Sequence, residues 1–299
     1  MSTVETAVGA TERYTCPFCR QQSDGSGLTC PSCGAPIDVT RSRDDSGWTE
    51  LPPIPDMTRI QFGRATALIT GGQVPIAELA LSGDEEVFFC HHVLLWSDPV
   101  VKLAPMSLSG AFTRSLGGLP IVMMTATGPG HLAFSQDHCG ELVAVPLDDG
   151  QAVDVREHQF LTATTSVDYS WSHTNIHYNV REGNDSKRHY PVGQFIDRFQ
   201  SKGPGLLLLH VPGNVFLRDL ADGESLLVQG GALVYKDATV GMQLHLEHLG
   251  GSGIGLQGPG TVPWLRVQGP GRIATCSVFG EGGVVYNLAG TSTATSTSW

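Results

Sequence analysis

Four cysteines near the start of the chain are the residues whose types and spacing most directly suggest chemistry. They form two Cys-x-x-Cys pairs, Cys16 with Cys19 and Cys30 with Cys33. Zinc prefers four soft ligands in a tetrahedron, and each such turn can place two thiolates on one side of the ion. The spacing therefore predicts a zinc ribbon that holds one structural Zn²⁺ per chain. Four thiolates leave no open coordination position, so we expect this zinc to fold the segment and not to catalyse a reaction.

A redox dithiol or a set of disulfides would be the other interpretations of these pairs. A redox Cys-x-x-Cys motif normally occurs once, close to a βαβ pattern, which the sequence lacks. The remaining cysteines, Cys90, Cys139 and Cys276, are far apart and odd in number, so they indicate no disulfide framework. Because the first residues also lack the pattern of a signal peptide, we expect the protein in a reducing cytoplasm.

The eleven histidines raise the alternative of a second metal site. His91 and His158 fall at one position of the repeat described below, where the third copy has Gly231, and Glu157 could add a carboxylate ligand. A solvent-exposed turn that accepts glycine equally well is the competing interpretation. The stretch LHLEH has the residue types of a cupin metal motif at the wrong spacing, and no nucleophile elbow or phosphate loop occurs. The sequence therefore predicts no catalytic residues and no enzyme.

The composition narrows the classes of protein to which the chain can belong. Its 299 residues carry a formal net charge of −11 without a basic patch, so nucleic-acid binding is not expected. No apolar run reaches the roughly 18 residues that a membrane span needs, so we expect no transmembrane segment. The 37 glycines and 18 prolines, with many β-branched residues, indicate short strands joined by turns and hence an all-β fold.

Changes in composition along the chain divide it into five segments. These are a polar N-terminus (residues 1–14), the zinc ribbon (15–37), a polar, proline-rich linker (38–56), a β domain of three repeats (57–290) and a Ser/Thr-rich tail (291–299).

Three stretches of the β domain align without a gap, and a glycine begins each of them. These glycines are Gly83, Gly150 and Gly223, and apolar residues follow at matching distances. Gly-Pro-Gly turns accompany the copies, at residues 128–130, 203–205, 258–260 and 269–271. One unit alone could not bury its apolar face, so we expect three units to pack into one closed, pseudo-threefold β body. We also expect Gly130, Gly205 and Gly260 to have backbone conformations that alanine tolerates poorly.

The stretches GPGHLAFS and DDGQAVDVREHQFLTATTSVDYS, followed by GPGLLLLH and LADGESLLVQGGALVYKDATV, resemble the "altered inheritance of mitochondria" biogenesis family, number twenty-four of that series. The likeness covers about residues 58 to 285. It implies the fold type of the tryptophan RNA-binding attenuation protein (TRAP), a β-roll type of body, and some bacterial members carry a zinc ribbon in front. Eukaryotic members are associated with the organisation of the mitochondrial inner membrane. The resemblance brings no catalytic motif to this chain, and the first repeat departs most from the family pattern.

Together these observations predict a cytoplasmic, non-enzymatic, homo-oligomeric assembly or scaffold protein. The β body would associate with itself through apolar strand surfaces, as a closed oligomer or a filament. The zinc ribbon would dock another protein or a neighbouring subunit. Two alternatives stay open: a small-molecule-binding or cupin-like, metal-dependent β-barrel enzyme, and an RNA-binding ring by analogy with TRAP, which the negative charge disfavours.

Overall fold

The computed structural model describes residues 14–15, 21–23, 29–32, 34, 46–106, 123–182, 185–249, 260–279, 284–285 and 293–294. The chain divides into two compact units, residues 1–48 and 49–299. In the first unit, the short strands β1 (Tyr14–Thr15) and β2 (Gln22–Ser23) pair antiparallel. The second unit contains the larger sheets.

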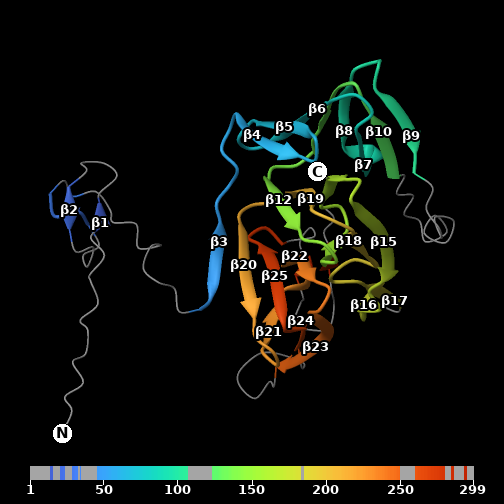
Figure 1. Cartoon of the computed structure of the whole chain (residues 1–299). Helices are drawn as coiled ribbons and strands as arrows, with labels where there is room; N and C mark the ends of the chain where they lie inside the picture. The colour runs from blue at the N-terminus through green and yellow to red at the C-terminus, as the bar shows by residue number, and fades with distance from the viewer. Residues whose placement is uncertain are drawn as a thin grey trace, which may run out of the picture. The chain divides into compact units, whose positions relative to one another are not determined.

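The regular elements of the described residues are β-strands and two short 3₁₀ helices, η2 (His91–Val93) and η3 (Gly230–Ala232). The prediction of an all-β fold is therefore confirmed (Figure 1). Strands are favoured because valine, isoleucine, threonine and aromatic residues alternate or run together between glycine turns.

Three copies of a six-stranded unit contain most of the strands. Repeat 1 consists of β6 (Ile76–Leu81), β7 (Glu86–Cys90), β8 (Leu94–Ser97), β9 (Lys102–Pro105), β10 (Met123–Thr127) and β11 (Gly130–Phe134). Repeat 2 consists of β12 (Glu141–Leu147), β13 (Ala152–Arg156), β14 (Phe160–Thr164), β15 (Val167–His173), β18 (Phe195–Ser201) and β19 (Gly205–Val211). Repeat 3 consists of β20 (Val215–Leu220), β21 (Ser225–Val228), β22 (Leu233–Asp237), β23 (Gly241–Leu249), β24 (Gly260–Gln268) and β25 (Gly271–Cys276).

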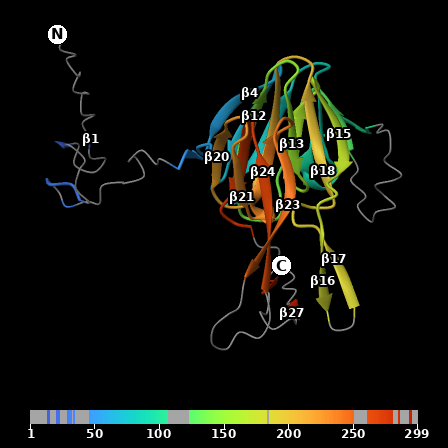
Figure 2. The same cartoon turned by 90° about the horizontal axis from the view of Figure 1, so that it is seen from below.

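The remaining strands flank these repeats. They are β3 (Trp48–Leu51), β4 (Thr58–Phe62), β5 (Ala65–Thr70), β16 (Tyr178–Glu182), β17 (Asp185–His189), β26 (Val284–Val285) and β27 (Thr293–Ala294). The strands β16 and β17 form a hairpin inserted in repeat 2, and Figure 2 shows it extending away from the body.

The strands pair in the same way in all three repeats. In each repeat the first and third strands pair with the sixth, and the second and fourth strands pair with the fifth. Each third strand also contains a bulge at the same place, which leaves one residue without an opposite partner. These bulged residues are Leu95, Leu161 and Val234. The prediction of a three-repeat β body is confirmed by this shared pattern.

The gapless alignment of the three glycines is wrong by one residue in repeat 1. A backbone N–H···O=C bond closes each turn, and the donors are Glu85, Gln151 and Glu224. These three residues therefore correspond to one another. Gly150 and Gly223 stand directly before their donor, whereas Gly83 stands two residues before its donor. Glycine supplies a positive φ at either central position of a turn, so the glycines alone do not fix the register.

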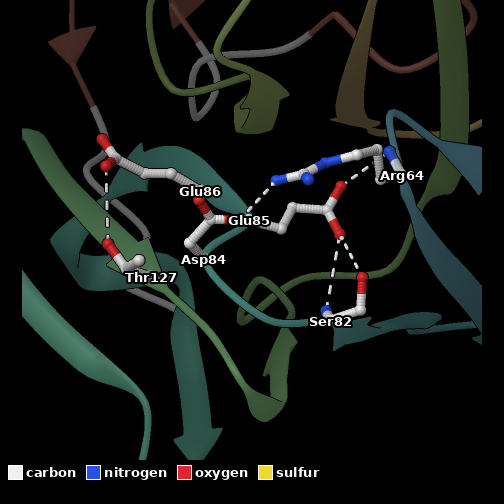
Figure 3. A network of polar contacts seen from close by, with 6 residues as sticks. All are labelled: Arg64, Ser82, Asp84, Glu85, Glu86 and Thr127. Carbon is white, nitrogen blue, oxygen red and sulfur yellow. Dashed lines mark hydrogen bonds and ion pairs between the residues drawn. The ribbon is translucent and has the colours of Figure 1, made fainter.

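The side chains of the corresponding residues also close their own turns. Figure 3 shows Glu85 of repeat 1, whose carboxylate accepts hydrogen bonds from the Arg64 backbone N–H at 2.6 Å and from the Ser82 hydroxyl at 3.4 Å. In the other repeats Gln151 accepts from the backbone N–H of Asp148 at 3.1 Å, and Glu224 accepts from that of Ala221 at 2.9 Å. A long polar side chain at this position satisfies backbone groups that the tight turn leaves without partners.

The repeats join by strand pairing across their boundaries. The third strand of repeat 2, β14, pairs with the second strand of repeat 1, β7. The third strand of repeat 3, β22, pairs in the same way with β13 of repeat 2. The resulting sheet orders are β12-β19-β14-β7-β10-β9, β15-β18-β13-β22-β25-β20-β3, β4-β5-β6-β11-β8 and β21-β24-β23. Among the described strands, β8 and β21 end their sheets without a cross-repeat partner, so the expected closure of the body is not found.

Aromatic side chains fill the core where repeats 1 and 2 meet. The rings of Phe88 and Phe160 lie 5.5 Å apart between centroids, and those of Phe160 and Phe199 lie 4.5 Å apart. All three side chains are buried. They come from both repeats, so the first boundary has a continuous apolar core.

Candidate functional site

A cavity of about 710 Å³ lies beside the start of β8. Its apolar wall includes Leu94 and Leu95, and three imidazoles contribute polar surface: those of His92, His138 and His158. Such a mixture of apolar wall and few polar groups is typical of small-ligand sites.

The repeat structure places two of these histidines together. In the corrected register, His92 and His158 each follow the turn-closing residue by seven positions, and Gly231 is their counterpart in repeat 3. Their rings lie 6.4 Å apart between centroids. The pairing of His91 with His158 in the sequence prediction was therefore off by one residue, because of the glycine turn that shifts repeat 1. His91 itself is exposed.

The hypothesis of a second metal site gains no support from this geometry. Within the part of the chain that the structure describes, no three His, Cys, Asp or Glu side chains are grouped so that they could hold a metal ion. Glu157 is buried, yet it does not join the two histidines in such a group. The LHLEH stretch lies on β23, where Glu247 accepts a hydrogen bond from the Trp264 indole at 2.9 Å.

The surroundings lower the pKa of two histidines, one on the cavity wall and one next to it. Burial, and then the nearby His158, lower the pKa of His92. His210 on β19 is fully buried, and its ring lies 4.7 Å from that of the cavity residue His138. Burial, followed by the proximity of His138, lowers the pKa of His210 to about 4. Neither ring nitrogen of His210 has a hydrogen-bond partner among the described residues. The site can therefore offer the neutral imidazole of His92 to a ligand.

Sequence reasoning missed His210 because it ends the apolar run GLLLLH of β19. Nothing in that run distinguishes a buried histidine from one that faces solvent. The contact with His138 depends on how β19 and the chain after β11 pack, which no local pattern reports.

The predicted zinc ligands lie mostly outside the described residues. Cys16, Cys19 and Cys33 are among the residues that the structure does not describe, and Cys30 is buried. The backbone N–H of Gly34 donates a hydrogen bond to the Cys30 carbonyl at 2.8 Å, and Gly34 has a φ of 72°. This bond links the backbone at Cys30 to that at Gly34, and the zinc site stays a prediction.

Comparisons with known proteins agree with the repeat architecture. In the described residues no helix is long and apolar enough to cross a membrane. A family model for mitochondrial biogenesis AIM24 matches residues 67–278, a range that runs from β5 to just beyond β25. None of the curated proteins matches the chain.

A solved structure shows the same fold. The crystal structure of a protein from Streptococcus pyogenes is similar over 72% of this chain and 94% of that chain, with a TM-score of 0.53 at 20% sequence identity. The resemblance that the Gly-Pro-Gly and Asp-Gly turns indicated is thereby confirmed, because the family match spans all three repeats. The chain belongs to the mitochondrial biogenesis AIM24 family.

Proposed function

We propose that this protein is a cytoplasmic, non-enzymatic assembly protein that forms homo-oligomers through its β body. The zinc ribbon would dock a partner protein or a neighbouring subunit. The observation that carries the proposal is the unequal burial of equivalent residues in the three repeats. The bulged residue Leu95 of β8 is 54% exposed, whereas its counterparts Leu161 and Val234 are 0% exposed.

The next position on the same strand shows the same contrast. Trp96 is 41% exposed, whereas its counterparts Thr162 and Tyr235 are 0% and 5% exposed. Fully burying a large apolar side chain is worth about 1.5–3 kcal/mol. Two adjacent side chains of this kind on a sheet edge therefore favour a surface that is covered by another molecule. Self-association supplies such a cover without requiring a second component.

Self-association is tested on the full chain by light scattering coupled to size exclusion. At micromolar concentration we expect a particle larger than a dimer, whose average mass falls when the sample is diluted, because strand-edge contacts are individually small. A mass that stays at the 31.8 kDa of one chain at every concentration would remove the proposal.

The zinc site is tested by elemental analysis. We expect one zinc per wild-type chain and none in a Cys16→Ser, Cys19→Ser double variant, because two thiolates alone do not hold a structural zinc. The β body should keep its melting temperature in this variant, since residues 49–299 form a separate compact unit. Full zinc occupancy in the variant would show that other ligands bind the metal.

A further inference from the structure

The two boundaries between repeats obey one rule of strand pairing. At each boundary, the third strand of a repeat lies antiparallel to the second strand of the repeat before it. At the first boundary Thr162 of β14 is opposite Phe89 of β7. At the second boundary Tyr235 of β22 is opposite Val155 of β13.

The register of the two boundaries is also the same. Thr162 and Tyr235 each stand eleven residues after the turn-closing residue of their own repeat. Phe89 and Val155 each stand four residues after theirs. The remaining pairs continue this register, Ala163 opposite Phe88 and Thr164 opposite Val87 at the first boundary, and Lys236 opposite Asp154 and Asp237 opposite Val153 at the second. The chain thus contains one junction, built twice with different side chains.

The strands β8 and β21 are the halves of this junction that have no partner among the described residues. β8 is the third strand of repeat 1, and β21 is the second strand of repeat 3; each ends its sheet. Leu227 of β21 is 43% exposed, whereas its counterparts Phe88 and Asp154 are 2% and 3% exposed. On β8 the side chains of Leu95 and Trp96 are likewise exposed, whereas their counterparts in repeats 2 and 3 are buried. Both edges therefore have the composition of a buried junction.

The two edges do not meet within one copy of the chain. Figure 1 shows β8 and β21 at opposite ends of the β body, with repeat 2 between them. Neither edge contains the lysine or proline that commonly protects a free edge. The bulge at Leu95 does not prevent pairing, because β14 and β22 have the same bulge and still pair.

We propose that β8 of one copy pairs antiparallel with β21 of a second copy, in the register of the two internal junctions. Trp96 would then lie opposite Val228, Ser97 opposite Leu227, and Asp98 opposite Leu226. The contact joins two different edges, so it repeats head to tail and builds a ring or a filament. This inference rests on the proposed self-association and specifies its interface.

Cysteine cross-linking tests the partner and the register together. One preparation has Ser97→Cys and the other has Leu227→Cys, and both are compared with wild type to measure the background from the native cysteines. We expect a disulfide-linked dimer when the two preparations are mixed under mild oxidation, and background levels in each alone, because the two positions are directly opposite only between copies. A matched control, Ser225→Cys, lies two residues from Leu227 on the same face of β21 and should cross-link at a lower rate.

Other cross-linking patterns would overturn the interface. Self-linking of the Ser97→Cys preparation alone would indicate a symmetric β8–β8 contact. A disulfide within the single chain of the Ser97→Cys, Leu227→Cys double variant would show that the body closes on itself. Cross-linking at background level in the mixture would also reject the junction.

A charged substitution on β21 distinguishes two negative results. Either the proposed interface is wrong, or the protein does not self-associate. We expect Leu227→Lys to reduce the average mass to that of one chain and to leave the β fold of that chain intact, because the side chain is exposed within one copy. The control Val278→Lys changes a side chain that is 55% exposed and outside both edges, and it should leave the mass unchanged. If wild type assembles and Leu227→Lys assembles equally, the interface is wrong while self-association stands. A monomeric wild type would remove both.

Discussion

Replacing Asp154 by alanine is expected to lower the free energy of unfolding by about 3–5 kcal/mol, the range for breaking a buried ion pair. Asp154 lies on β13, where its carboxylate accepts hydrogen bonds from the Lys236 ammonium at 2.7 Å and from Arg198 at 2.6 and 2.9 Å. The side chains of Asp154 and Lys236 are only 4% and 5% exposed. Removing the carboxylate leaves the Lys236 ammonium buried without its counter-charge, at the strand pairing that joins repeats 2 and 3.

A second substitution shows that the orphaned charge causes the loss. Adding Lys236→Met to Asp154→Ala should recover most of the lost stability, because an apolar side chain of similar length then fills the site without a charge. Arg198 is 45% exposed, so it can turn toward water in both variants. Denaturant unfolding of the two single variants and the double variant gives the coupling energy.

An exposed ion pair provides the matched control. Asp168 and Lys202 form a pair whose side chains are 53% and 70% exposed, and Asp168→Ala should cost no more than about 1 kcal/mol. Equal losses for Asp154→Ala and Asp168→Ala would contradict the importance of burial.

The effect of Asp154→Ala should also depend on pH. Burial by itself would raise the pKa of Asp154, but hydrogen bonds from Arg198 and Lys236 outweigh it and hold the pKa below its usual value. A carboxyl with a lowered pKa in the folded state contributes its stability above the pKa of the unfolded chain, about 3.9. That contribution is lost as the pH falls through the lowered pKa. The difference between wild type and Asp154→Ala should therefore be full at pH 7 and shrink in acid below about pH 4.

The all-β fold and its three repeats could be predicted from sequence because both depend on local patterns. Glycine turns, apolar runs and β-branched residues recur at similar intervals, and each marks a strand or a turn by itself. The register of repeat 1 could not be predicted from these marks. Gly83 takes the first central position of its turn while Gly150 takes the second, and the choice is visible only in the backbone hydrogen bonds of Glu85 and Gln151.

The candidate site and the exposed edges of β8 and β21 could not be predicted from the sequence for a different reason. The sequence prediction paired His158 with His91 instead of His92, because a one-residue shift decides which of the two adjacent histidines corresponds to His158. His210 contacts His138 through strand packing. The exposure of Trp96 and Leu227 depends on which strands pair across repeats, and their apolar character alone is equally consistent with a buried core.

The turn glycines were predicted in part. Gly130 has a φ of 137°, as expected, whereas Gly205 lies outside the left-handed range and Gly260 begins β24. The third repeat uses the turn at residues 269–271 instead, and Gly271 has a φ of 134°. The sequence offers Gly-Pro-Gly twice within the fourteen residues 258–271, so it could not identify which copy joins the fifth and sixth strands.

Replacing Gly130 or Gly271 by alanine is expected to lower the free energy of unfolding by about 2–4 kcal/mol, from backbone strain together with overpacking. Both have a φ that side chains rarely adopt, and an added Cβ would also lie 2.7 Å from Val101 at Gly130 and 2.9 Å from Val240 at Gly271. Val101 and Val240 are buried counterparts in repeats 1 and 3, so neither can move freely. Denaturant unfolding of single Gly→Ala variants measures the losses.

Three other glycines separate the contribution of strain from that of space. At Gly205 an added Cβ would lie 2.6 Å from Val167, the counterpart of Val101 and Val240, but φ is unrestrictive; alanine there should cost about 1–3 kcal/mol by overpacking alone. Gly223 has a φ of 75° and open space, so strain alone should cost about 1 kcal/mol. Gly203 has open space and no positive φ. Alanine there should be neutral or stabilise by up to about 1 kcal/mol, because it restricts the unfolded chain.

The loss of stability should therefore be largest at Gly130 and Gly271, smaller at Gly205 and Gly223, and absent at Gly203. A Gly203→Ala variant as unstable as Gly130→Ala would show that the turns fail for a reason other than strain and crowding.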